Sequence, residues 1–171
     1  PTIKGYTLVT GQATTIDIVA VSGTNVNELT IYYVKNDTEW TTITFAPGAN
    51  ATLLGTTSYE VIKGHALNGA NQPPITLPTI NPNLGYKEDE TTPWPGYSAS
   101  GQVSGETTYT ANVVVDETVK FPYEVKYLLQ GETTVLHTPK TGEHHIGTLD
   151  LVSHPTIKGY TLVTGQATTI D

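Results

Sequence analysis

The chain begins and ends with the same seventeen residues. Residues 1–17 read PTIKGYTLVTGQATTID, and residues 155–171 repeat them without a change. Chance does not produce an identity of this length, so the chain either carries a duplicated segment or spans one period of a longer array. The two copies are offset by 154 residues. This period is longer than the ~20–50 residues of solenoid repeats, and it predicts a tandem array of whole domains, two per period.

The sequence between the two copies is typical of β-structure. Thr, Val, Ile and Tyr, which favour strands, are frequent, and Gly, Asn and Pro punctuate them at short intervals. Tyr123, Val125 and Tyr127 alternate with charged residues, which predicts a half-buried strand. Only residues 61–71 hint at a helical turn. We expect strands at Glu28–Lys35, Trp40–Ala46, Thr57–Lys63, Thr107–Asp116, Val119–Gln130 and Gly147–Val152.

Composition narrows the classes of function. The chain has no Cys and no Met, which excludes disulfides, zinc–thiolate sites and thiol catalysis and suits a protein exposed to oxidation. Its net charge of −8, with Lys as the only basic residue besides His, argues against nucleic-acid binding. We find neither an apolar run of membrane-spanning length nor a secretory leader, and we expect no membrane insertion.

The polar residues form no recognisable catalytic or metal-binding motif. His144 and His145 are adjacent, so in a strand they would face opposite sides, and we interpret them as exposed loop residues. The acidic run Lys87–Glu90 lacks the alternate spacing of a calcium loop. No GxSxG or SxxK motif occurs, and although a scattered triad would leave no motif, strand Thr usually reflects β-propensity. We therefore expect no enzyme, no metal and no cofactor.

Two kinds of candidate site remain. Exposed aromatic rings stack on sugars, which makes Trp40, Trp94 and Tyr97 candidate glycan contacts, although alternating strand positions more often indicate core residues. Lys4 and Lys126 are candidates for an intramolecular isopeptide cross-link to an Asn or Asp, with solvent-facing lysines as the alternative.

Part of the sequence resembles a mucin-binding-protein (MucBP-like) module when the repeat is read across its own seam. The resemblance lies in VKYLLQGE at residues 125–132, in IKGYTLVTG at residues 157–165, and in LTIYYVK at residues 29–35. The match therefore takes its earlier strands from residues 119–171 and its later strands from residues 1–37.

The segment between these parts is similar to SHIRT-type repeats, and more loosely to internalin-type B repeats, of Gram-positive surface proteins. Its opening, WTTITFAPGANATLLGTTSYEVIKG, and its ending, with Trp94 and the run Thr108–Ala111, match those families. Pro-Trp-Pro replaces the usual Gly-Trp at Trp94. We assign residues 38–118 to this module.

The two resemblances imply a mostly β chain with two small β-grasp-like modules, built from mixed or antiparallel sheets with at most a short helix, in an elongated tandem array. They also imply a bacterial cell-surface adhesin that is extracellular and attached to the cell wall through regions outside this chain. Two functions follow. The chain is a structural stalk repeat that projects a binding domain, or it is a multivalent mucin- or glycan-binding module.

The division of the MucBP-like module predicts the partner of the chain. Residues 1–37 and 119–171 supply different strands of one module, yet an entire domain separates them. We expect the end of one copy to complete the beginning of the next, head to tail, either covalently within a longer protein or by strand exchange between chains.

Overall fold

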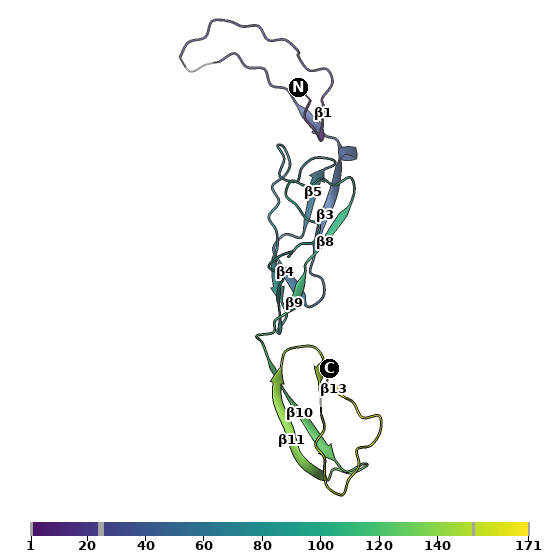
Figure 1. The fold of residues 1–171 in the computed structure, drawn as a ribbon. Coiled ribbons are helices and arrows are strands. Elements are labelled where there is room, and N and C mark those ends of the chain that lie inside the picture. The colour runs from purple at the N-terminus through teal and green to yellow at the C-terminus, as the bar shows by residue number, and fades with distance from the viewer. Residues whose placement is uncertain (1, 24–25, 152, 171) are drawn as a thin grey trace. The chain divides into compact units, whose positions relative to one another are not determined.

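The protein is built almost entirely from short strands. The computed structural model describes residues 2–23, 26–151 and 153–170. Within these ranges it has thirteen strands, no α-helix, and one turn of 3₁₀ helix, η1 (Asp37–Glu39), whose N-terminus is capped by the Asn36 side chain (Figure 1). The predicted mostly β class is confirmed, and residues 61–71 form the end of a strand followed by turns and an isolated bridge.

A three-stranded sheet holds most of the core. Its central strand β3 (Trp40–Ala46) matches the predicted segment, and it pairs antiparallel with β5 (Ser58–Ile62) and parallel with β8 (Thr107–Thr110). Ile43 and Phe45 point to the buried side of β3 with exposures of 0% and 1%. Thr42 and Thr44, which alternate with them, lie on the opposite face, as the two-residue period of a strand requires.

The remaining strands form two-stranded sheets. Four of these pairs are antiparallel: β1 (Tyr6–Leu8) with β2 (Tyr33–Lys35), β7 (Tyr86–Glu88) with β9 (Val113–Val115), β10 (Phe121–Leu128) with β11 (Val135–His144), and β12 (Leu149–Asp150) with β13 (Thr169–Ile170). β4 (Ala51–Leu54) lies beside β6 (Thr79–Pro82). Two-stranded sheets are marginally stable in water by themselves, so each of these depends on what packs against it.

The longest hairpin contains a strand that the sequence did not predict. β10 has the expected alternation of half-buried and exposed residues, but β11 has a polar sequence interrupted by Pro139 and Gly142. The register moves from Val125 opposite Lys140 to Tyr127 opposite His137, which forms a bulge at residues 138 and 139. Pro is tolerated at a bulge because no ladder hydrogen bond is required there.

Three predicted strands are shorter or divided. Of the predicted strand at residues 28–35, only β2 forms. Of the predicted strand at residues 147–152, only β12 forms, and Val152 lies outside the described residues. Residues 107–116 divide into β8 and β9, because the amide of Ala111 donates to Ala46 while the amide of Asn112 donates to Pro93. Consecutive residues therefore bond to different segments, and the strand ends between them.

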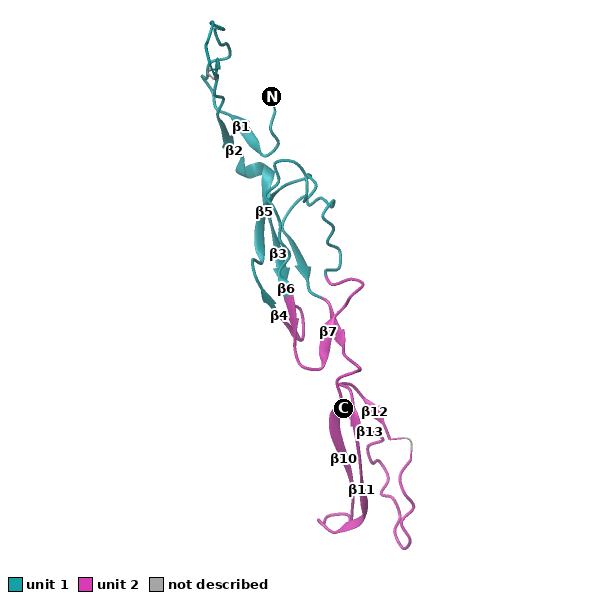
Figure 2. Ribbon diagram, turned by 90° about the vertical axis from the view of Figure 1, so that its left-hand side faces the viewer, with its two compact units in different colours: residues 1–47, 53–79, 94–111 teal, residues 48–52, 80–93, 112–171 magenta. Residues whose placement is uncertain are grey.

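The residues group into two compact units, which Figure 2 colours separately. The first contains residues 1–47, 53–79 and 94–111, and the second contains residues 48–52, 80–93 and 112–171. All but one of the buried apolar side chains in the described residues lie between Trp40 and Ala111; the exception is Leu151. The module boundaries at residues 37 and 118 stay a prediction.

Candidate functional site

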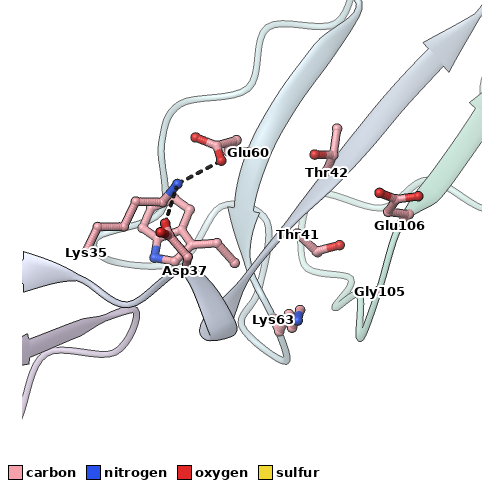
Figure 3. A pocket seen from close by; sticks show the side chains of 9 residues that line it. Lys35, Asp37, Thr41, Thr42, Glu60, Lys63, Gly105 and Glu106 are labelled. Atoms are coloured by element: carbon pink, nitrogen blue, oxygen red, sulfur yellow. Dashed lines mark hydrogen bonds and ion pairs between the residues drawn. The ribbon is translucent and has the colours of Figure 1, made fainter.

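The first unit has a polar groove beside its sheet, with a volume of about 430 Å³ (Figure 3). β2, η1, β3, β5 and the turn before β8 supply its walls. The pairing of β3 with β5 places Glu60 opposite Thr42, and this register brings distant parts of the sequence to one surface. The lining residues are Lys35, Asp37, Trp40, Thr41, Thr42, Glu60, Lys63, Gly105 and Glu106.

Lys35 is the centre of the charges in this groove. Its Nζ atom lies 2.7 Å from Glu60 Oε1 and 3.3 Å from Asp37 Oδ1. The hydrogen bond to Glu60 is the main reason that the pKa of Lys35 lies above its ordinary value. Because both carboxylates are largely exposed, these ion pairs are screened and add little stability. They hold the lysine side chain in one position.

Trp40 borders the groove but is itself mostly enclosed. Its side chain is 8% exposed, Lys35 Nζ lies 5.0 Å from its ring centroid, and Tyr6 meets it edge-on at 5.7 Å. Its Nε1 donates a hydrogen bond to the carbonyl oxygen of Gly5 at 2.7 Å. Trp40 thus anchors the first copy of the repeated segment, and Lys35 covers part of the ring surface that a sugar would use.

Trp94 and Tyr97 belong to an aromatic cluster around Phe45. Their ring centroids lie 4.9 and 5.6 Å from that of Phe45, and Tyr109 stands edge-on to Tyr97 at 5.2 Å. Trp94 is 7% exposed, whereas Tyr97 is half-buried. Burial raises the pKa of the Tyr97 and Tyr109 hydroxyl groups. The structure brings Trp94 and Tyr97 together in packing contacts, with Trp40 in contact with different partners.

The two candidate cross-linking lysines lie at the surface. Lys126 Nζ is 3.3 Å from Glu124 Oε2, and its side chain is 60% exposed. Lys4 is exposed as well. None of the described residues is a buried charged group of the kind that an isopeptide bond requires. The cross-link and the glycan contacts stay predictions.

The adjacent histidines lie side by side. The ring centroids of His144 and His145 are 4.1 Å apart. His144 is the last residue of β11, so the alternation of side chains along a strand does not extend to His145. Each Nδ1 atom lies 2.8 Å from the carbonyl oxygen of the following residue. Among the described residues, His and acidic side chains form no group of three that could hold a metal ion.

Sequence reasoning did not identify the groove. Lys35 and Glu60 are 25 positions apart and belong to no motif, so only the pairing of β3 with β5 reveals that they meet. The charges at Lys35 and Glu60 gave a weak signal, because Lys35 ends one predicted strand, Glu60 lies in the middle of another, and opposite charges on two strands can meet in a suitable register.

Comparison with known proteins gives no match: no family model, no curated protein and no solved structure matches the chain. In the part of the chain that the structure describes, no helix is long and apolar enough to cross a membrane.

Proposed function

We propose that the chain is a structural tandem-repeat segment of a bacterial cell-surface adhesin, part of a stalk that projects a binding domain from the cell wall. The observation that carries this proposal is the identity of residues 1–17 and 155–171. A copy-to-copy identity over a domain-sized period is what an array of repeated modules requires. The resemblance to Gram-positive surface repeats supplies the location and the attachment through regions outside this chain.

The proposed array consists of two alternating β-grasp-like modules. Residues 38–118 form the SHIRT-like module. Residues 119–171 of one copy join residues 18–37 of the next in the MucBP-like module, because residues 155–171 are also the first seventeen residues of that next copy. The uneven distribution of buried side chains supports this division, because residues 40–111 contain nearly all of the core. The acidic composition supports it too, since net negative charge keeps crowded copies apart and soluble.

Small-angle scattering of chains with one, two and three periods tests the stalk function. A stalk predicts that the maximum dimension grows by the same increment with each added period. A three-period chain that is as compact as a globular protein of its mass, or whose dimension grows only as the square root of the copy number, would contradict the proposal.

The alternative function is multivalent binding of mucin or other glycans. The groove at Lys35 and Glu60 favours it, since it offers hydroxyl, amine and carboxylate groups beside the edge of an indole ring. A two-period chain should then bind immobilised mucin by avidity, and Glu60→Gln should weaken that binding. Glu124→Gln is the matched control, because Glu124 also pairs with a lysine at the surface. Equal binding by both variants would argue against the groove.

A further inference from the structure

The two copies of the repeated segment make different strand pairs. In the first copy, Tyr6–Leu8 form β1 and pair with the later strand β2. In the second copy, the corresponding residues 160–162 form no strand, and Thr169–Ile170 pair instead with the earlier strand β12. The counterparts of Thr169–Ile170 in the first copy, residues 15 and 16, form no strand either. Each copy uses the part of the segment that the other leaves unpaired.

These two uses are compatible within one segment. The residues that bond to β2 and the residues that bond to β12 do not overlap, and residues 9–14 separate them. The local backbone also agrees: Gly5 and Gly159, which precede the strand residues, have positive φ angles of 84° and 86°. A single segment can therefore pair with an earlier strand through its end and with a later strand through its beginning.

Burial shows that both ends of the chain lack part of their packing. Among the residues that the structure describes, nine large apolar side chains between Leu8 and Val34 are exposed, and so are five between Leu128 and Val163, whereas residues 40–118 have four. Most of these side chains lie outside the strands, and exposed apolar side chains in such numbers mark a surface that another element covers. The identity of the two segments indicates what that element is.

We infer that the occupant is a second copy of this chain, and that residues 155–171 are the strand that joins the two halves of one module. Within the array, this segment pairs through Thr169–Ile170 with its own β12. Through Tyr160–Leu162 it pairs with the β2 of the following copy, with Tyr160 opposite Lys35 and Leu162 opposite Tyr33. The inference rests on the head-to-tail array of the proposed function and assigns its register.

A disulfide test is well suited to this chain because it has no native Cys. Amide hydrogen bonds from Asn36 to Gly5 and from Val9 to Tyr32 place Leu8 and Tyr33 at a non-hydrogen-bonded position of β1 and β2. The amide hydrogen bond from Leu151 to Thr168 likewise places Asp150 and Thr169 at a non-hydrogen-bonded position of β12 and β13. Opposed residues at such positions are close enough to form a disulfide.

The experiment uses a two-copy chain in which a second set of residues 18–171 follows Asp171 directly. The first copy carries Leu162→Cys, and the second copy carries its partner, Tyr33→Cys. The first copy also carries the pair Asp150→Cys and Thr169→Cys. After mild oxidation, peptide mapping should find both disulfides in the same molecules. The single chain with Asp150→Cys and Thr169→Cys alone shows that the substitutions are tolerated.

The control moves one cysteine by two positions, from the second copy's Tyr33 to its Lys35, which keeps the side of the strand but changes the register. This control should form at least tenfold less disulfide with Leu162→Cys. Equal cross-linking in both registers, no cross-link to either position, or a first disulfide that prevents the second would overturn the inference. Scattering that still grows linearly with copy number would then leave the stalk function standing.

Discussion

Gly5 and Gly159 occupy the same place in the repeated segment, yet their surroundings differ. A Cβ atom at Gly5 would lie 3.0 Å from side-chain atoms of Ile62 and Trp40, while none lies within 4 Å at Gly159. Both have positive φ angles, so alanine is strained at either position by about 1–2 kcal/mol. Gly5→Ala should destabilise the first unit by about 1–3 kcal/mol more, because it overpacks this contact.

Denaturant unfolding followed by circular dichroism measures this difference, because Trp40 and Trp94 both belong to the first unit and their fluorescence would not report on Gly159 in the second. Gly159→Ala is the matched control, with the same substitution in the same sequence context. A similar shift of the unfolding midpoint in both variants would show that the contact with Trp40 and Ile62 is not tight.

The aromatic cluster predicts a loss of stability at alkaline pH. Burial raises the pKa of Tyr97 and Tyr109 above 10.0, so the folded state holds these protons more tightly than the unfolded state. Their contribution is fully present below about pH 10 and is lost as the pH rises through the raised pKa values. The free energy of unfolding should fall as the pH is raised from 8 to 11. Tyr97→Phe should reduce the slope of this free energy against pH.

Tyr160→Phe is the control for this pH dependence, because Tyr160 is 51% exposed. It removes a phenol hydroxyl that lies outside the aromatic cluster. A slope that both substitutions reduce equally would assign the effect to general charge repulsion.

At the residue scale, the sequence identified aromatic residues but not their surroundings. Trp40 is a candidate for sugar stacking only if its ring is exposed, and the alternating strand pattern left both a surface and a core position open. Whether the ring is covered depends on Tyr6 and Lys35, which reach it through the pairing of β1 with β2. This pairing joins short segments separated by more than twenty residues, and short segments give little register information.

Among the turns, the one at Asp89 predicts a loss of stability in acid. The Asp89 carboxylate accepts hydrogen bonds from the amides of Thr91 and Thr92 and from the Asn112 side chain. The amide bonds, chiefly that of Thr91, lower the pKa of Asp89, so its contribution is present above pH 3.8 and is lost as the pH falls through the lowered pKa. Asp89→Asn should reduce the fall in melting temperature between pH 6 and pH 3.

Circular dichroism can follow this melting, with Glu90→Gln as the control for removing one negative charge from the same turn. Asp116 has a lowered pKa for the same kind of reason, because Thr118 donates to it. Asp89→Asn should therefore remove part of the acid dependence and leave the rest. An unchanged profile would show that the turn does not hold the carboxylate in solution.

At the element scale, sequence patterns located strands best where an apolar alternation coincided with burial. β3 was predicted to the residue because Ile43 and Phe45 alternate with Thr. β11 was missed because its Thr, Lys and Gly residues pair with β10 without being buried in a core. Residues 107–116 were predicted as one strand because hydrophobicity does not indicate that Asn112 bonds to Pro93 and Asp89.

For the whole molecule, the two identical segments predict that the full chain resists head-to-tail association. A neighbour's residues 160–162 could pair with β2 only by displacing residues 6–8, which have the same sequence, so no strand pair would be gained. Thr7→Pro removes an amide donor opposite Val34 and should open β2. This variant should associate as its concentration rises, whereas the unmodified chain should not.

Sedimentation velocity over a hundredfold concentration range measures this association, and tryptophan fluorescence checks that the first unit remains folded. Thr161→Pro is the matched control, since it makes the same change in the second copy and leaves β2 occupied. Thr7→Pro combined with Thr161→Pro should be monomeric again. Association of Thr161→Pro alone would contradict the role of residues 160–162.

The identity of the two segments has a consequence for how an array changes its length. If one segment fills every junction, then recombination that adds or removes a whole 154-residue period leaves each junction with the same two partners. No new interface has to arise when the gene lengthens or shortens. A substitution in this segment, by contrast, alters the fit to two neighbours at once, and this double constraint favours the spread of one version through all copies.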